Sequence, residues 1–164
     1  WVDESTGLDC MINRGPMGSL CGYVGVPEGH PFFGKGYSEC LEHGSDCDSS
    51  WEHKTTGDVD VHGGLTYAGA RGEGEDPAKG ICHIPQPGRP DHVWWFGFDC
   101  AHAWDLVPSM EASNRRYYEK ARSEGDAEGM RIWGRQPEPD QTYRNVRYVE
   151  SEVRDLARQL SEVA

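Results

Sequence analysis

Four side chains that could bind a metal ion lie near the ends of predicted strands. Asp99, His102 and Asp105 follow the apolar run 93–98 at intervals of three residues, so a helical turn would place them on one side. His62 lies at a glycine-rich bend and could add a ligand from a neighbouring strand. Two imidazoles and two carboxylates suit zinc, manganese or iron. These four residues are the candidate metal site, although their spacing matches no defined metal motif.

The same region is also the candidate site for a small ligand. Loops and bends after strands leave side chains and backbone N–H groups accessible. The ligand-binding candidates are His30, His62, Gly63, Gly64, Asp99, His102 and Trp104. The competing interpretation is structural, with Asp99 as a turn cap, His102 as a half-buried, hydrogen-bonded side chain and the glycine pair as a bulge or a turn with positive φ.

No catalytic residue can be assigned from the sequence. His62-Gly63-Gly64 resembles in outline the oxyanion-forming His-Gly-Gly of some hydrolases, but the chain has no Gly-x-Ser-x-Gly nucleophile motif. Cys100 lies two residues from His102, but two side chains at this separation on a strand or a turn need not touch, so the sequence does not establish a Cys–His nucleophile pair. Whether the protein is an enzyme therefore stays open at this stage.

The segments around these residues predict a mostly antiparallel sheet. Two apolar stretches at 10–13 and 20–26 predict a β-hairpin. The aromatic run 93–98 predicts a central strand. Alternating residues at 58–61, resumed at 65–67, predict one bent strand or two strands joined by a kink, with His62 at the bend.

The end of the chain predicts a long amphipathic helix with Thr142 as its N-cap. Its apolar positions recur every three or four residues and are Val146, Val149, Val153, Leu156 and Leu160. Residues 110–122 have helical propensity, residues 37–44 predict a short helix, and residues 131–133 predict a short edge strand.

These elements predict one α+β domain over residues 1–164, with the C-terminal helix packed on the sheet. Residues 1–9 are expected to be a frayed or truncated lead-in. Residues 69–92 are expected to form a long surface loop, because they are rich in glycine and proline. Residues 134–141 are expected to link the body to the last helix.

The charge of the chain limits its partners. Its 164 residues carry 16 basic and 28 acidic side chains, a formal net charge of −12. Such a surface repels nucleic acid and anionic lipid, whereas it could attract a basic protein groove. No segment approaches the ~20 apolar residues of a membrane span. We therefore expect a small-molecule ligand or a host protein as partner, with no membrane and no nucleic acid.

Six cysteines contain no Cys-x-x-Cys pair. Cys10, Cys21 and Cys100 lie in apolar surroundings typical of buried thiols. Cys40 and Cys47 lie in a polar stretch, where zinc would need ligands from elsewhere in the chain. This pattern favours a reducing, cytoplasmic setting.

Three motifs carry a resemblance to a known group of proteins: Gly22-Tyr-Val-Gly-Val-Pro-Glu-Gly-His-Pro31, Val61-His-Gly-Gly-Leu-Thr-Tyr67 and Val93-Trp-Trp-Phe-Gly-Phe-Asp-Cys-Ala-His102. With the closing segment 143–160 they resemble a family of uncharacterised small proteins of phages and prophages. The resemblance implies phage origin and a place in the host cytoplasm, but no fold or activity.

Three functional hypotheses follow. The first is a phage accessory binding protein that captures a small polar ligand, for example a nucleotide, or a host protein, in counter-defence. The second is a metal-dependent hydrolase that uses His62, Asp99, His102 and Asp105 with a divalent ion as cofactor. The third is an acidic mimic of DNA that inhibits a nucleic-acid enzyme. The sequence leaves the oligomeric state open, including a homo-oligomer.

Overall fold

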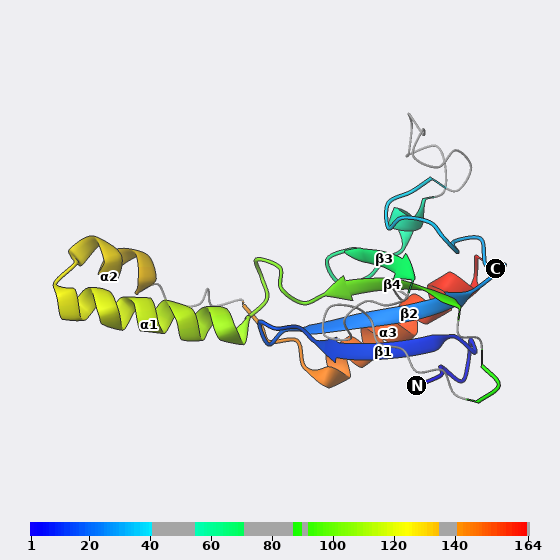
Figure 1. Cartoon of the computed structure of the whole chain (residues 1–164), viewed down its shortest axis with the longest axis horizontal. Coiled ribbons are helices and arrows are strands. Elements are labelled where there is room, and N and C mark those ends of the chain that lie inside the picture. Colours follow the sequence, from blue (N-terminus) through cyan, green and yellow to red (C-terminus); the bar gives the residue numbers. More distant parts are fainter. Residues whose placement is uncertain (41–54, 71–86, 90–91, 135–140, 164) are drawn as a thin grey trace.

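The fold is an antiparallel sheet with one long helix packed on it (Figure 1). The computed structural model describes residues 1–40, 55–70, 87–89, 92–134 and 141–163. Four strands lie in the order β1-β2-β4-β3, and all neighbours are antiparallel. Their bounds are Asp9–Arg14 for β1, Leu20–Pro27 for β2, Tyr67–Ala70 for β3 and Val93–Asp99 for β4, and the helix α3 spans Val146–Ser161. The predicted α+β fold is confirmed.

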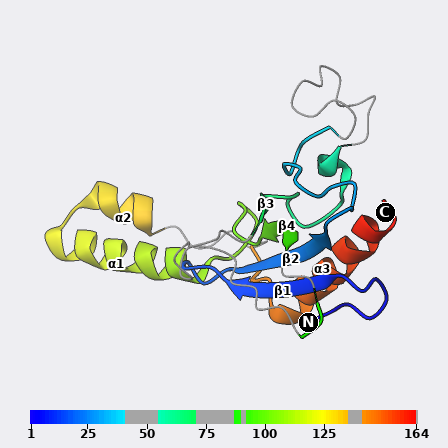
Figure 2. The same cartoon turned by 45° about the vertical axis from the view of Figure 1, so that its right-hand side comes forward.

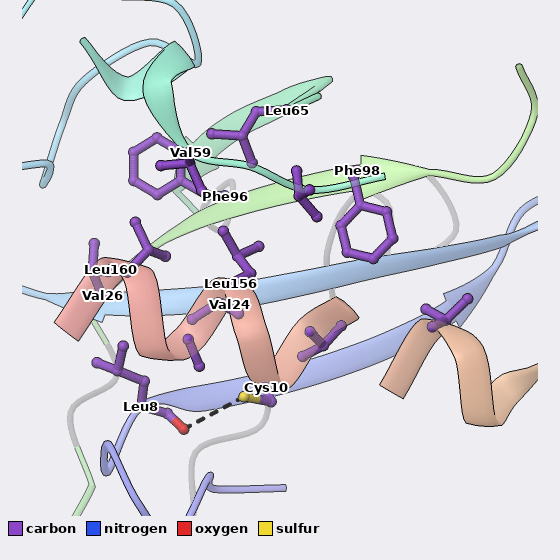
Figure 3. Close-up of a cluster of buried hydrophobic side chains, with 14 of the residues drawn as sticks. Leu8, Cys10, Val24, Val26, Val59, Leu65, Phe96, Phe98, Leu156 and Leu160 are labelled. Carbon is purple, nitrogen blue, oxygen red and sulfur yellow. Dashed lines mark hydrogen bonds between the residues drawn. The ribbon is translucent and has the colours of Figure 1, made fainter. Parts of the chain in front are cut away.

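The main core lies between one face of the sheet and α3 (Figure 3). Alternate residues of a strand point to the same face, and on β2 and β4 the residues on the helix side have apolar side chains. On this side, the side chains of α3 and these two strands with 0–1% exposure are Val24, Val26, Phe96, Phe98, Val149, Val153, Leu156, Ala157 and Leu160. The apolar spacing that predicts the C-terminal helix is therefore the spacing of its buried face, except that Val146 in the first turn is 52% exposed.

Gly22 of β2 allows α3 to approach the sheet closely. A Cβ atom at this position would lie 2.5 Å from Cγ2 of Val153 and 2.6 Å from the ring of Phe98. Both side chains belong to the core. The glycine is therefore required by close packing of backbone and side chain rather than by a bulge.

The opposite face of the sheet carries a smaller apolar cluster. Trp95 and Val93 are buried there, and Tyr23 and Tyr67 pack against them. Trp94 points to the helix side, where its Nε1 donates a hydrogen bond to the carbonyl of Lys35 at 2.9 Å. The two tryptophans thus lie on opposite faces, as adjacent strand residues must.

The strand predicted at 58–61 does not form. Thr55 caps a short 3-10 helix, η1 (Thr56–Asp58), and the Asp58 carboxylate in turn accepts a hydrogen bond from the backbone N–H of Thr55 at 2.7 Å. This reciprocal cap fixes a helical turn that ends at Asp58, the first residue of the alternating segment. Val59 and Val61 are still buried in the core. The alternation therefore reflects the burial of these side chains, although the segment forms no hydrogen-bonded strand.

Two helices that follow β4 form a hairpin. The helix α1 (Pro108–Glu124) starts with proline in its first turn, where a missing N–H costs nothing. The helix α2 (Ala127–Trp133) is capped by Asp126 and includes residues 131–133, so the predicted edge strand there is wrong.

Three predicted boundaries also change. Residues 37–40 form a turn and an isolated bridge instead of a helix, and residues 41–44 lie outside the described part. The helix α3 takes Asn145 as its N-cap in place of Thr142. Gly69 and Ala70 belong to β3, while most of the predicted 69–92 loop and of the 134–141 linker is not described.

The first residues are ordered against the sheet rather than frayed. Val2 forms a bridge with Asp9, and the Asp3 carboxylate accepts hydrogen bonds from Ser5 and Thr6. Asp3 also pairs with Arg154 of α3 at 3.1 Å. Among the described residues, no helix has the length and apolarity needed to cross a membrane.

Two buried thiols are expected to be chemically inert. Burial raises the pKa of both Cys10 and Cys100 to about 12. Because only the thiolate reacts, alkylation at pH 8 should be on the order of a thousandfold slower than for an open thiol. Peptide mapping after a timed iodoacetamide pulse measures this, with the same pulse in urea as control. Rapid labelling of either cysteine in the native protein would contradict the burial described here.

Candidate functional site

His62, His102 and Asp105 meet beside the end of β4. One nitrogen of each histidine and one carboxylate oxygen of Asp105 all lie within 4.8 Å of one another. The pairing of β3 with β4 brings them together. Tyr67 of β3 pairs with Gly97 of β4, so the bend that precedes β3 lies next to the segment that follows β4.

The bend places His62 with its ring inside the protein. Gly63 and Gly64 both have positive φ, and the N–H of Gly64 closes the turn on the carbonyl of Val61 at 2.8 Å. Only 4% of the His62 side chain is exposed. Its Nε2 lies 2.8 Å from Oδ2 of Asp105 and its Nδ1 lies 3.0 Å from the hydroxyl of Tyr148.

Asp105 is the centre of the cluster, and its side chain is completely buried. Oδ2 accepts the backbone N–H of His102 at 3.0 Å as well as bonding His62. Oδ1 accepts Nε of Arg144 at 2.9 Å. Burial alone would raise the pKa of Asp105, but the hydrogen bonds from His62, Arg144 and the backbone outweigh it and hold the pKa below its usual value. The carboxylate is therefore ionised at neutral pH.

His102 presents a buried nitrogen without a hydrogen bond. Its Nδ1 lies 3.4 Å from Oδ2 of Asp105, yet among the described residues this buried atom has no hydrogen-bond partner. The ring rests on the backbone of Gly63, where any Cβ atom would overlap the imidazole. A buried polar atom without a hydrogen bond costs free energy, so this nitrogen indicates that a further group, such as a water molecule or an ion, binds here.

The solvent side of the cluster is aromatic and basic. Trp104 stacks on His102 with ring centroids 5.2 Å apart and planes 8° apart, and it is 48% exposed. The guanidinium of Arg144 lies 4.8 Å from the centre of the Tyr148 ring. The pKa of Arg144 is raised, first by its hydrogen bond to Asp105. Solvent reaches the cluster from this side, because His102 is 20% exposed whereas Asp105 and His62 are buried.

Two of the sequence candidates lie outside the cluster. Asp99 accepts the backbone N–H of Ala101 at 3.0 Å, so it serves as a turn cap. His30 is buried elsewhere, where its Nδ1 accepts the N–H of Phe32 and its Nε2 bonds the carbonyl of Leu160. Both ring nitrogens of His30 are thus occupied by backbone, and its role is to hold its loop to the end of α3.

Three further site residues come from the C-terminal segment, where no candidate was predicted. Arg144 and Tyr148 contact Asp105 and His62 as described, and Glu152 accepts the backbone N–H of His62 at 2.9 Å. The three residues are spaced by four. Tyr148 and Glu152 lie on α3, where this spacing puts them on one side of the helix, and Arg144 lies just before the N-cap Asn145. This regular spacing of polar residues is the signal that could have identified them.

The geometry of the cluster fits a small divalent ion. Two ligands about 2.0–2.1 Å from a tetrahedral zinc ion are about 3.3 Å apart. The separation of 3.4 Å between His102 and Asp105 already matches, and the 2.8 Å between His62 and Asp105 would open by about 0.5 Å. The ligand atoms lie up to 4.8 Å apart, so the two imidazoles would also have to move closer together around an ion. The hydroxyl of Tyr148 can accept a hydrogen bond as well as donate one, so it supports the His62 tautomer that leaves Nε2 free for a metal.

Comparison of the chain with known protein families, with curated proteins and with solved structures finds no match. The chemistry of the site therefore rests on its own geometry.

Proposed function

We propose that this protein is a metal-dependent hydrolase whose ion is held by His62, His102 and Asp105. The observation that carries the proposal is the buried Nδ1 of His102, which has no hydrogen bond among the described residues and lies beside a second imidazole and an ionised carboxylate. A bound cation would use that nitrogen and would be neutralised in part by Asp105. Asp99 is not part of the proposed ligand set, because it caps a turn.

The groups around the ligands support this proposal. Catalytic zinc sites commonly use three protein ligands and keep one position for water. Metal-binding imidazoles bond a second group through their other nitrogen, and ligand carboxylates are themselves hydrogen-bonded. Tyr148 and Arg144 occupy these positions on His62 and Asp105. The same donor set also suits iron(II) or manganese, so the test includes those ions.

The proposed ion would activate water for hydrolysis. A bound divalent ion polarises the substrate and lowers the pKa of its water to about 7. Trp104 and Arg144 border the exposed side of the cluster. An aromatic face beside a guanidinium favours a substrate with a flat ring and a negative charge, such as a nucleotide.

Metal analysis tests the proposal. Untagged full-length protein purified without chelator should contain about one divalent ion per chain. His102→Ala should lower that content by about tenfold or more, because one of three ligands is lost. His92→Ala is the matched control, since His92 is an exposed histidine paired with Glu28. Added zinc at about a hundred times its dissociation constant should stabilise the unsubstituted protein by about 2.7 kcal/mol.

Hydrolysis is measured on bis-(p-nitrophenyl) phosphate and p-nitrophenyl acetate with each metal in turn. Turnover should require metal and His102 but not His92. Metal far below one equivalent, together with melting that EDTA does not change, would overturn the metal centre. Stoichiometric metal without turnover on any substrate would retain the metal site and overturn hydrolysis.

A second function, ligand capture without catalysis, is favoured by one observation. Trp104 offers half of its surface to solvent while its other side is held parallel to His102, which resembles a stacking platform for a base. Nucleotides and cyclic nucleotides would then raise the melting temperature without metal, and Trp104→Ala would remove the shift. No melting shift with any nucleotide would count against this function.

The arrangement of charge on α3 does not favour a DNA mimic. Its exposed acids pair with arginines one turn away: Glu150 with Arg154, and both Asp155 and Glu162 with Arg158. Alternating signs do not imitate a row of phosphates. Phage origin, counter-defence and a cytoplasmic location stay predictions from the sequence.

A further inference from the structure

The hairpin of α1 and α2 projects away from the sheet. Figures 1 and 2 show it extending from one end of the body in both views. Among the helices and strands described, α1 and α2 pack only on each other. The base of the hairpin is held by the β1–β2 turn, where the N–H of Ser109 donates to the carbonyl of Met17 at 3.1 Å. We call residues 108–134 the helical arm.

The helical arm has little core of its own. Only Ala121 and Gly129 are buried in it, and neither has a large side chain. Most helical stability in proteins comes from packing of an apolar face, and two such small residues supply little of it. A partner for the arm is therefore expected.

The arm exposes an aromatic surface that could supply this packing. Tyr117 and Trp133 are 54% and 38% exposed, and their rings contact each other with centroids 4.9 Å apart. Met110 is 48% exposed and precedes Tyr117 by seven residues, or two helical turns, so both lie on one side of α1. We call Met110, Tyr117 and Trp133 the arm face. Exposed aromatic clusters of this kind mark interaction sites.

The net charge of the arm indicates which kind of partner it binds. Residues 108–134 carry five basic and five acidic side chains, whereas the whole chain carries a net charge of −12. The arm is thus neutral and the rest of the protein carries the entire net charge. A basic partner would be drawn to the body rather than to the arm, whereas a second neutral arm meets no repulsion.

The length of the arm keeps two acidic bodies far enough apart for the repulsion between them to be screened. The 17 residues of α1 span about 26 Å at 1.5 Å per residue. Two arms packed antiparallel place their bodies at opposite ends, separated by more than the Debye length of about 8 Å at physiological salt. We propose that the arm is a homodimerisation element, in which two arm faces pack about a twofold axis to form a four-helix bundle.

Sedimentation equilibrium of the full chain tests this proposal. We expect a dimer at a protein concentration of about 100 µM. Tyr117→Glu should raise the dissociation constant by about thirtyfold or more, because it places a charge in an aromatic contact. Ser123→Glu adds the same charge at an exposed position off the arm face and should leave dimerisation unchanged. Circular dichroism checks that both variants keep their helices.

Salt provides a second readout. Apolar association between acidic bodies should tighten as salt rises from about 0.05 to 0.5 M, because screening weakens the repulsion. A chain that stays monomeric under all these conditions overturns the proposal. So does a dimer that Tyr117→Glu and Ser123→Glu weaken equally, or one that dissociates as salt rises.

Discussion

Asp105→Ala is expected to destabilise the protein by about 3–5 kcal/mol, because the change leaves several buried groups without their shared partner. His62, Arg144 and the N–H of His102 all bond this one carboxylate. None of them regains a partner from the alanine methyl group. The free energy of unfolding from urea titration is the measurement.

Asp99→Ala is the matched control for this prediction. It removes the same side chain from a residue only six positions earlier, where the carboxylate caps a turn at an exposed contact. Loss of such a cap costs about 1 kcal/mol. Equal losses for the two variants would contradict the central position given to Asp105.

The pH dependence of Asp105→Ala has a defined sign. The pKa of Asp105 lies below its unfolded value of about 3.9. The unfolded chain therefore binds the proton first as pH falls, so the stabilisation is complete above about pH 4 and is lost below it. The difference in stability between the unsubstituted protein and the variant should shrink as the pH is lowered from 5 to about 2.

Local patterns predict most of the sheet and α3 because these elements bury one regular face. The runs at 20–26 and 93–98 form β2 and β4, and the spacing of Val149, Val153 and Leu156 predicts the buried face of α3. The pattern at 58–61 fails because the cap at Thr55 stabilises a helical turn more than the alternation favours a strand. Hydrogen bonds between capping side chains and the backbone favour a helical turn over a strand, and the hydrophobic periodicity of the segment does not predict them.

The candidate cluster is predicted in part for a similar reason. His62, His102 and Asp105 follow from the meeting of a bend with a strand end. Asp99 does not belong to the cluster, because side chains on a strand alternate between the two faces of the sheet. Phe98 faces α3, so the next residue of β4 faces the other side of the sheet.

The residues of the C-terminal segment could not be placed from local sequence. Tyr148 and Glu152 of α3, and Arg144 just before it, reach the cluster only because α3 crosses the sheet at a particular angle and position. That crossing is set by contacts distant in sequence, including the approach of Val153 to Gly22. The regular spacing of these polar residues is visible in the sequence. Which residues they contact, however, depends on the tertiary fold.

Gly63→Ala is expected to displace His102 and to lower the metal content by about tenfold, since the added methyl group occupies the space of the imidazole ring. Gly64→Ala is the matched control, because Gly64 also has positive φ but its Cβ would meet no atom within 4 Å. Both variants carry the same backbone strain of about 1 kcal/mol. Gly63→Ala should lose about 1–3 kcal/mol more than Gly64→Ala, because its methyl group also overlaps the His102 ring, and only its metal content should fall.

The two glycine variants thus separate the effect of backbone strain on metal binding from the effect of displacing the His102 ring. Metal content per chain and the histidine ring signals in ¹H–¹⁵N spectra are measured for both. In Gly63→Ala the His102 signals should shift and lose their response to zinc, whereas Gly64→Ala should respond as the unsubstituted protein does. If both variants bind a full equivalent of metal, His102 is not a ligand. The unpaired Nδ1 would then have to be explained by the packing of Trp104 against the ring.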